Sequence, residues 1–224
     1  MKETSKSISR RLRDPNFISR YFRGTGIDIG AGTDPVSLYH ELFPLMGKVR
    51  IWDVQDGDAQ FMKGVEDNTY DFVHSSHCIE HLHNPVIGLE NWIRIVKPGG
   101  FIIVTVPDED LYEQGIFPSN KNSDHKWTFT IYKKSSWSEK SINVLELLTV
   151  YGNTIEINKV ELLDQTYRYS LPQFDQTLTP VGECAIEIIL RKRTVAELEA
   201  GGRLNPKGEL SKLDFEMLTG YRLK

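Results

Sequence analysis

The sequence predicts an α/β fold with helices on both faces of a doubly wound, mostly parallel sheet. The first observation is a short apolar stretch, residues 26–29, that passes into Gly30 and Gly32 with the spacing Gly-x-Gly. A first strand enters a ligand-binding loop in this way. The second observation is that strand-like and helix-like stretches alternate from residue 26 to residue 106. This order is typical of parallel strands joined by crossover helices.

The predicted elements of the first half follow one another closely. Asn84 and Pro85 suit the N-cap and the first position of a helix, and Leu89, Trp92 and Ile93 recur after them at helical spacing. The expected order is a helical segment over 5–22 interrupted near Pro15, a strand at 26–29, a helix at 35–45, a strand at 48–53, a polar loop at 55–64, a strand at 70–74, the helix from residue 84, a turn at 97–100 and a strand at 101–106.

The second half predicts a different arrangement. Residues 107–134 are polar and aromatic and are expected to form an insertion above the sheet; a helix is expected over 138–151, and two strands at 155–163 and 184–192 as an antiparallel pair. The whole is then a Rossmann-like sheet of about seven strands with one antiparallel C-terminal strand. Its parts are a basic helical segment at 1–23, a core at 24–193 and a charged tail at 194–224.

The composition fits a single domain over residues 1–224. With 39% hydrophobic and 26% charged residues, the chain is typical of a globular protein. A net charge of −4 gives no general attraction for nucleic acid, which is therefore not an expected partner. Cys78 and Cys184 form no CxxC pair and no apolar signal segment opens the chain, so we expect a cytoplasmic protein without a membrane span. The oligomeric state is left open.

The N-terminal segment carries an excess of basic residues. One interpretation is the solvated face of a helix, and another is a lid whose arginines bind an anionic acceptor, since arginine pairs well with phosphate and carboxylate. Nucleic acid is a third, weaker interpretation, because the remainder of the chain is acidic. The residues concerned are Lys2, Lys6, Arg10, Arg11, Arg13, Arg20 and Arg23, against Glu3 and Asp14.

The glycine loop argues against a dinucleotide ligand. A dinucleotide fingerprint needs a third glycine three residues after the second, and Pro35 stands there. Asp28 and Asp34 flank the loop and would repel a pyrophosphate. We therefore expect a ligand that is cationic or uncharged near this loop and rich in hydroxyls and amines.

Five features in order resemble the motifs of class I S-adenosylmethionine-dependent methyltransferases. They are residues 26–32, Asp53, the pair Asp58-Ala59, the strand and turn at 70–82, and the turn at 97–100. The chain is most similar to the small-molecule type found in bacterial surface-polysaccharide biosynthesis, that is, of capsule and lipopolysaccharide. The resemblance implies a Rossmann-like fold and the cofactor S-adenosylmethionine, with S-adenosylhomocysteine as product.

The resemblance also implies how adenosine binds. Asp53 follows Gly32 by 21 residues, close to the spacing of a ribose-binding acid, and would accept hydrogen bonds from both ribose hydroxyls. Asp58 would accept from the adenine amino group and Ala59 would offer its N–H. The alternative for Asp53 is a solvated acid in a loop. The alternative for Asp58-Ala59 is a simple turn. The pair lies only five residues after Asp53, so either the family's third strand is cut to a stub, which we favour, or this is not the adenine pair.

The methionine part of the cofactor would lie against Gly30 and Gly32. Asp28 would anchor the loop or reach the cofactor ammonium through water. Ser75, at the end of a strand, would offer its carbonyl beside the methionine part. For Ser75 a capping or turn role is the alternative.

The acceptor is expected beyond the carboxyl ends of the strands. His77 is the first candidate for a catalytic base, Asp108 is the best-placed carboxylate, and His125 is placed to close over the site from the insertion. Each has an ordinary polar surface role as its alternative. His77, Asp108 and His125 together are also a candidate set for a divalent metal that lowers the pKa of an acceptor hydroxyl. His81 is expected to be structural.

These observations predict methyl transfer to a small polar acceptor. The expected acceptor is a hydroxyl of a sugar, or of an activated or phosphorylated precursor, in surface-polysaccharide biosynthesis. O-methylation is favoured over N-methylation because no Asn-Pro-Pro-Tyr-type motif follows the strand at 70–74. The alternatives are a nicotinamide-dependent oxidoreductase and a non-catalytic, methyltransferase-like binding domain.

Overall fold

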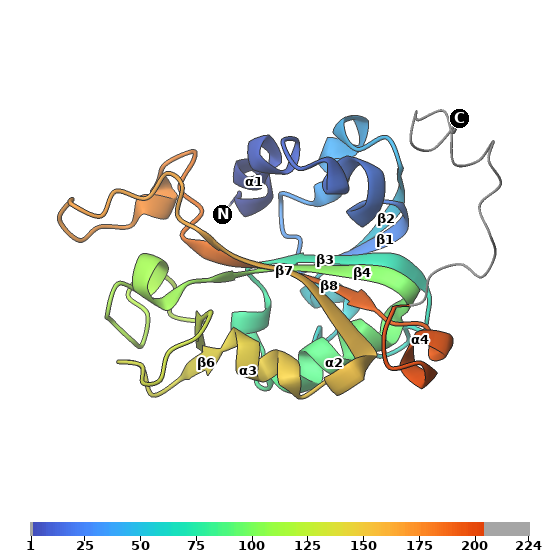
Figure 1. Cartoon of the computed structure of the whole chain (residues 1–224). Helices are drawn as coiled ribbons and strands as arrows, with labels where there is room; N and C mark the ends of the chain where they lie inside the picture. Colours follow the sequence, from blue (N-terminus) through green and yellow to red (C-terminus); the bar gives the residue numbers. More distant parts are fainter. Residues whose placement is uncertain (1, 204–224) are drawn as a thin grey trace, which may run out of the picture.

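A six-stranded sheet runs through the centre of the molecule (Figure 1). The computed structural model describes residues 2–203. The strand order is β2-β1-β3-β4-β8-β7, with β1 to β4 parallel and β8 antiparallel to both of its neighbours. The strands are β1 (Gly24–Ile29), β2 (Met46–Trp52), β3 (Tyr70–Ser76), β4 (Val96–Pro107), β7 (Ile155–Leu163) and β8 (Ala185–Lys192). The expected doubly wound α/β fold with one antiparallel strand near its end is confirmed.

Helices cover both faces of this sheet (Figure 1). On one face lie α1 (Glu3–Arg11), a π-helical turn (Phe17–Tyr21) and a 3₁₀ helix (Val36–Leu42). On the other lie α2 (Pro85–Ile95) and α3 (Val144–Thr149), with α4 (Val195–Glu199) at the sheet's end. The N-terminal helical segment breaks at residues 12–14, near Pro15 as expected, and Pro15 opens the next helical stretch, where its missing N–H costs nothing.

The sheet separates two apolar cores. Phe72 of β3 packs with aromatic side chains beneath α1, whereas Val73 packs with Trp92 of α2 and Ile102 of β4. Successive side chains of a strand point to opposite faces, so a strand buried on both faces is apolar throughout. The short apolar stretches of the sequence therefore predicted these central strands correctly.

The start of α2 has the capping hydrogen bonds that its sequence predicts. Asn84 Oδ1 accepts hydrogen bonds from the N–H groups of Val86 and Ile87, at 3.0 and 3.2 Å. Pro85 occupies the first helical position, where its missing N–H costs nothing. Asn84 and Pro85 thus begin the helix as predicted.

The main sheet has six strands, fewer than the expected seven. Between β2 and β3 the chain forms turns and a short 3₁₀ helix (Val54–Asp56). This stretch contains Gly57, Gly64 and several acids, which are poor residues for a buried strand. The third strand that the resemblance implies is thus absent altogether, and not only shortened.

Two further predictions were wrong in part. The helix expected over 35–45 is a 3₁₀ helix over Val36–Leu42. The helix expected over 138–151 begins only at α3, because Ser141–Asn143 (β6) pairs instead with Thr128–Thr130 (β5) in a small second sheet within the region of the insertion. Tertiary pairing overrides weak local helix propensity there. Of the tail predicted at 194–224, residues 204–224 lie outside the described part. Within residues 2–203 no helix is both long and apolar enough to cross a membrane.

Candidate functional site

The loop after β1 has the backbone that its glycines predict. Gly30 and Gly32 have φ angles of +70° and +53°, a conformation that side chains disfavour. A Cβ on Gly30 would lie 2.7 Å from the Cβ and Sγ atoms of Cys78, whereas a Cβ on Gly32 would meet nothing within 4 Å. Gly30 therefore permits the close approach of two loops, and Gly32 leaves open space beside the backbone.

Asp53 lies directly against this loop. Its Oδ2 accepts the N–H of Gly32 at 3.0 Å, and its Oδ1 accepts the N–H of Val54 at 2.8 Å. The carboxylate thus holds the end of β2 and the glycine loop together at the carboxyl edge of the sheet. Each oxygen keeps a second lone pair for a further donor.

Asp58 and Ala59 form a turn that is tied to α2. Asp58 is exposed and its Oδ1 accepts the N–H of Gln60 at 2.8 Å. The Ala59 carbonyl accepts the indole N–H of Trp92 at 2.9 Å. The turn is therefore held in place even though no third strand supports it.

Asp28 heads a buried series of ionisable side chains that the sequence did not reveal. Its Oδ2 accepts the N–H of Val36 at 2.6 Å and its Oδ1 contacts His74 Nδ1 at 2.6 Å. His74 Nε2 lies 3.0 Å from Arg11 Nη1, and Arg11 lies 3.3 Å from Glu187. Asp28 thus anchors the segment after the glycine loop. The signal in the sequence was too weak to find this series, because its members are far apart and belong to α1, β1, β3 and β8.

Two neighbouring arginines keep the carboxyl of Glu187 ionised. Burial alone would raise the pKa of Glu187, but the charges of Arg11 and Arg10 outweigh burial and lower the pKa to about 2. Glu187 is completely buried, so its negative charge depends on these two arginines.

Ser75 uses its side chain within the sheet. Its hydroxyl donates to the carbonyl of Ile29 at 2.9 Å, and the side chain is fully buried. This bond joins the ends of β1 and β3 next to the glycine loop, where the register pairs Ile29 with Ser75.

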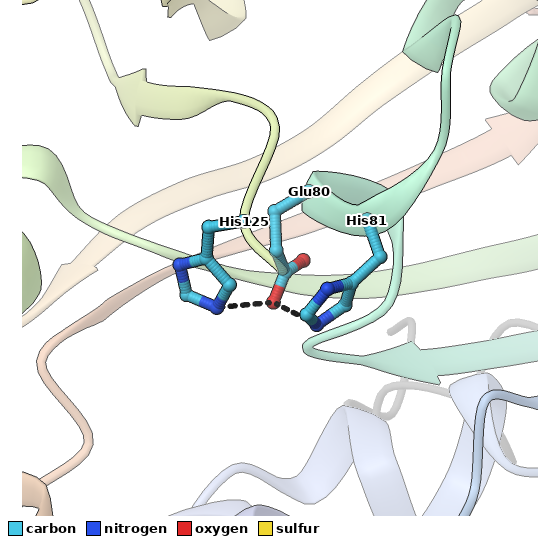
Figure 2. A group of neighbouring side chains, drawn as sticks. All are labelled: Glu80, His81 and His125. Carbon is cyan, nitrogen blue, oxygen red and sulfur yellow. Dashed lines mark ion pairs between the residues drawn. The ribbon is translucent and has the colours of Figure 1, made fainter. Parts of the chain in front are cut away.

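A cluster of imidazoles and one carboxylate follows β3 (Figure 2). Glu80 Oε1 lies 3.8 Å from His81 Nε2 and 3.9 Å from His125 Nε2. His77, with a φ of +53°, places its Nδ1 3.5 Å from the same oxygen. His125 enters from the insertion as predicted, whereas His81 was expected only to be structural and Glu80 was given no role. The spacing His-x-x-Glu-His at residues 77–81 is the signal that was available for them.

The Nδ1 atoms of two of these imidazoles face carboxylates. His125 Nδ1 lies 2.6 Å from Glu113 Oε1, and His81 Nδ1 lies 3.0 Å from Asp124 Oδ2. Because an ionised carboxylate only accepts hydrogen bonds, each Nδ1 carries the proton. The Nε2 atoms of both rings then face Glu80.

Burial dominates the protonation of this cluster. It raises the pKa of Glu80 to about 8. It lowers the pKa of His77 to about 3, helped by the neighbouring His125. His77 is therefore neutral at pH 7 and is a weaker base than its position in the sequence suggested.

Asp108 lies outside the cluster. Its Oδ1 accepts the N–H groups of Asp110 and Leu111, both at 3.0 Å, and burial raises its pKa to about 6. Among residues 2–203, the group whose potential metal-binding atoms lie within 4.8 Å of one another is Glu80, His81 and His125. The structure therefore brings His125 to the candidate metal site but does not bring Asp108 there.

Helix α1 lies across the glycine loop and the cluster. The N–H of Ser5, in its first turn, donates to Asp34 Oδ2 at 2.7 Å, and Glu3 Oε2 lies 3.9 Å from His77 Nε2. The basic side chains of α1 are occupied within the molecule, because Arg10 pairs with Glu183 and Glu187. The interpretation of this segment as a solvated face is therefore wrong for the buried Arg11 and for Arg10.

Comparisons with known proteins agree with this architecture. A family model described as a methyltransferase domain matches residues 10–145, more than half of the chain. A search of curated proteins finds no match.

Solved structures show the likeness in three dimensions. The chain is similar to an S-adenosylmethionine-dependent methyltransferase from Archaeoglobus fulgidus, with 17% identity, a TM-score of 0.53, and coverage of 86% of this chain and 95% of that one. It is similar to a chain of the complex between the Haloferax volcanii Trm112 methyltransferase activator and a methyltransferase, with 13% identity, a TM-score of 0.57, and coverage of 86% and 92%. The plantazolicin methyltransferase BpumL, solved with S-adenosylhomocysteine, gives 14% identity, a TM-score of 0.50, and coverage of 86% and 84%. At these identities the likeness concerns the fold.

Proposed function

Since the chain belongs to the methyltransferase-domain family and is an S-adenosylmethionine-dependent methyltransferase, we propose that its acceptor is a hydroxyl of a small polar molecule. The observation that carries the proposal is the polar carboxyl edge of the sheet beyond β1, β2 and β3. Asp53, the glycine loop and the turn at residues 76–81 meet there.

We propose that the cofactor lies along this edge. The ribose hydroxyls would bind Asp53, whose carboxylate already faces the loop at Gly32. The adenine would lie at the turn formed by Asp58 and Ala59, and the methionine part along Gly30 and Gly32. The buried Asp28 would act through the loop that it anchors.

Ser75 and Cys78 would then mark the methionine end of the cofactor. The Ser75 hydroxyl is bound to Ile29, so Ser75 would contact the cofactor through its carbonyl, as the resemblance implies. Cys78 contacts Gly30 and thereby joins the cofactor loop to the turn that carries His77. The bound cofactor supplies an electrophilic methyl group on a sulfonium.

Asp108 is the proposed proton acceptor of the reaction. During transfer the acceptor oxygen forms a bond to the methyl carbon, the carbon–sulfur bond breaks, and its electron pair stays on sulfur. The acceptor hydroxyl must lose its proton in the same process, and a group with a pKa of about 6 can take it near neutral pH. Asp108 follows β4, which pairs with the end of β3, so it borders the turn of His77.

The proposed acceptor class is a sugar, or an activated or phosphorylated precursor, in surface-polysaccharide biosynthesis. It rests on the resemblance of the motifs and of the inserted region. The structure makes α1 a poor anion clamp, because Arg10 and Arg11 are paired with carboxylates. An anionic acceptor would have to use exposed cations such as Arg13 instead.

A ligand comparison tests the proposed cofactor site. We expect S-adenosylhomocysteine to raise the melting temperature of the full chain, while NAD leaves it unchanged. Stabilisation by NAD and not by S-adenosylhomocysteine would contradict the assignment and favour an oxidoreductase. Cofactor binding without turnover on any sugar or sugar phosphate would contradict the proposed acceptor class and favour a binding role.

A further inference from the structure

We propose that Glu80, His81 and His125 form a binding site for one divalent transition-metal ion. The site goes beyond the methyl transfer described above, because the ion needs neither cofactor nor acceptor to bind. The three side chains come from the turn after β3 and from the insertion, and they point toward one another (Figure 2).

The carboxylate of Glu80 has no hydrogen-bond partner among the described residues. The side chain is completely buried. The gaps of 3.8 and 3.9 Å to His81 and His125 are too long for hydrogen bonds. A buried carboxylate without a partner is costly, and a cation between these three groups would remove that cost.

The two imidazoles are oriented as metal ligands are. Each ring directs Nδ1 to a carboxylate, Glu113 for His125 and Asp124 for His81. Metal-binding histidines are oriented in this way, since the second nitrogen is fixed by an outer carboxylate. The Nε2 atoms of both rings and an oxygen of Glu80 therefore converge on one point.

The spacing of the three side chains is close to that around a bound ion. Ligand atoms around a tetrahedral ion with bonds of about 2.1 Å lie roughly 3.4 Å apart. The separations of 3.8 and 3.9 Å from Glu80 Oε1 to the two Nε2 atoms exceed this value by about half an ångström or less. Small rotations of the side chains would close the site.

The donor set favours a particular class of ion. Two imidazoles and one carboxylate suit Zn²⁺, Mn²⁺, Fe²⁺ or Co²⁺, whereas Mg²⁺ and Ca²⁺ prefer oxygen ligands alone. His77 lies beside the site, and its two buried ring nitrogens have no hydrogen-bond partner among residues 2–203, so it is available as a further neighbour of the ion. If the proposed function holds, an acceptor hydroxyl on this ion would lose its proton more readily.

Cobalt binding tests this site directly. The full chain, freed of metal with a chelator, is titrated with Co²⁺ and followed by visible absorption and calorimetry. We expect one ion per chain, displaced by Zn²⁺. His81→Ala, His125→Ala and the isosteric Glu80→Gln should each weaken binding by about 100-fold or more, and Glu113→Gln by about 10- to 100-fold.

His83→Ala is the matched control, because His83 is exposed and lies two residues from His81. It should bind Co²⁺ as the wild type does. Binding of S-adenosylhomocysteine to each variant shows that it is folded and keeps the result separate from the cofactor assignment. The proposal is overturned if the wild type binds the cofactor product but not Co²⁺, or if Glu80→Gln and Glu113→Gln bind Co²⁺ with unchanged affinity. In the latter case the cluster is a proton-sharing network.

Discussion

Asp53 is the side chain on which the cofactor assignment depends most. It is half-buried and already accepts two backbone N–H groups at the loop. Hydrogen bonds to a charged group contribute about 1.5–3 kcal/mol, so Asp53→Ala should weaken binding of S-adenosylhomocysteine by about 10- to 100-fold in calorimetric titration. Asp67→Ala, which removes an exposed ion pair with Arg94, should leave the affinity unchanged. Equal affinities in wild type and Asp53→Ala would exclude Asp53 as the ribose ligand.

The role proposed for Asp108 leads to a prediction about how kcat/KM depends on pH. Its carboxyl has a pKa of about 6 because of burial, and only the ionised form can accept a proton. We expect kcat/KM to rise with pH through about 6. Asp108→Asn keeps an oxygen for the backbone bonds but should lower kcat by about 10²- to 10⁴-fold. Glu139→Gln, an exposed position, serves as the control. If kcat/KM of Asp108→Asn still rises with pH through about 6, another group is the base.

Glu187 should contribute strongly to stability through its two arginines. Removing one partner of a buried ion pair costs about 3–5 kcal/mol, so Glu187→Gln should lower the free energy of unfolding by about that much in urea. Glu66→Gln, an exposed position, is the control and should change little. A loss below about 1 kcal/mol would mean that Gln satisfies Arg11 and Arg10 as well as the carboxylate does.

Glu187 also leads to a prediction about how acid affects the stability of the fold. The pKa of Glu187 is about 2 in the folded protein, below its ordinary value of 4.5, so the unfolded chain binds the proton first. Its contribution is therefore fully present above about pH 4.5 and is lost as the pH falls toward 2. Glu187→Gln should reduce the slope of stability against pH in this window. Arg10, Arg11 and Lys159 are the charged partners that face it.

Helix α1 is fixed at its N-terminus by a residue from the glycine loop. Lys2 provides no side-chain cap, and Asp34 instead accepts the N–H and the hydroxyl of Ser5. An acid at a helix N-terminus contributes about 0.5–2 kcal/mol. Asp34→Ala should lower the unfolding free energy by this amount and expose α1 to limited proteolysis. Glu41→Ala, on the exposed side of the 3₁₀ helix, should do neither. Unchanged cleavage in Asp34→Ala would show that packing alone holds α1.

Strands and helices were predictable where a short stretch of sequence was enough to determine them. Apolar runs placed β3 and β4, and Asn84 with Pro85 placed the start of α2. The sequence could not predict β6, because Ser141–Asn143 becomes a strand only by pairing with β5. The missing third strand was foreseeable in part, since only five residues separate Asp53 from Asp58.

The sequence predicted site residues within single segments, but not how the segments come together. The turn after β3 supplied His77, and the insertion supplied His125, but their common neighbour Glu80 was not found. Its position depends on contacts between distant segments, such as the bond from the N–H of Lys126 to the Glu80 carbonyl. The pairing of Arg10 and Arg11 with β8 was hidden for the same reason.

A crystal structure with S-adenosylhomocysteine bound tests the central claim most directly. The account predicts ribose hydroxyls on Asp53, the amino acid part along Gly30 and Gly32, and the sulfur beside the turn of residues 76–81. It would be contradicted by the ligand lying at the opposite edge of the sheet, in the hollow lined by Arg20, Arg23 and Lys97, or by an Asp53 carboxylate that does not contact the ligand.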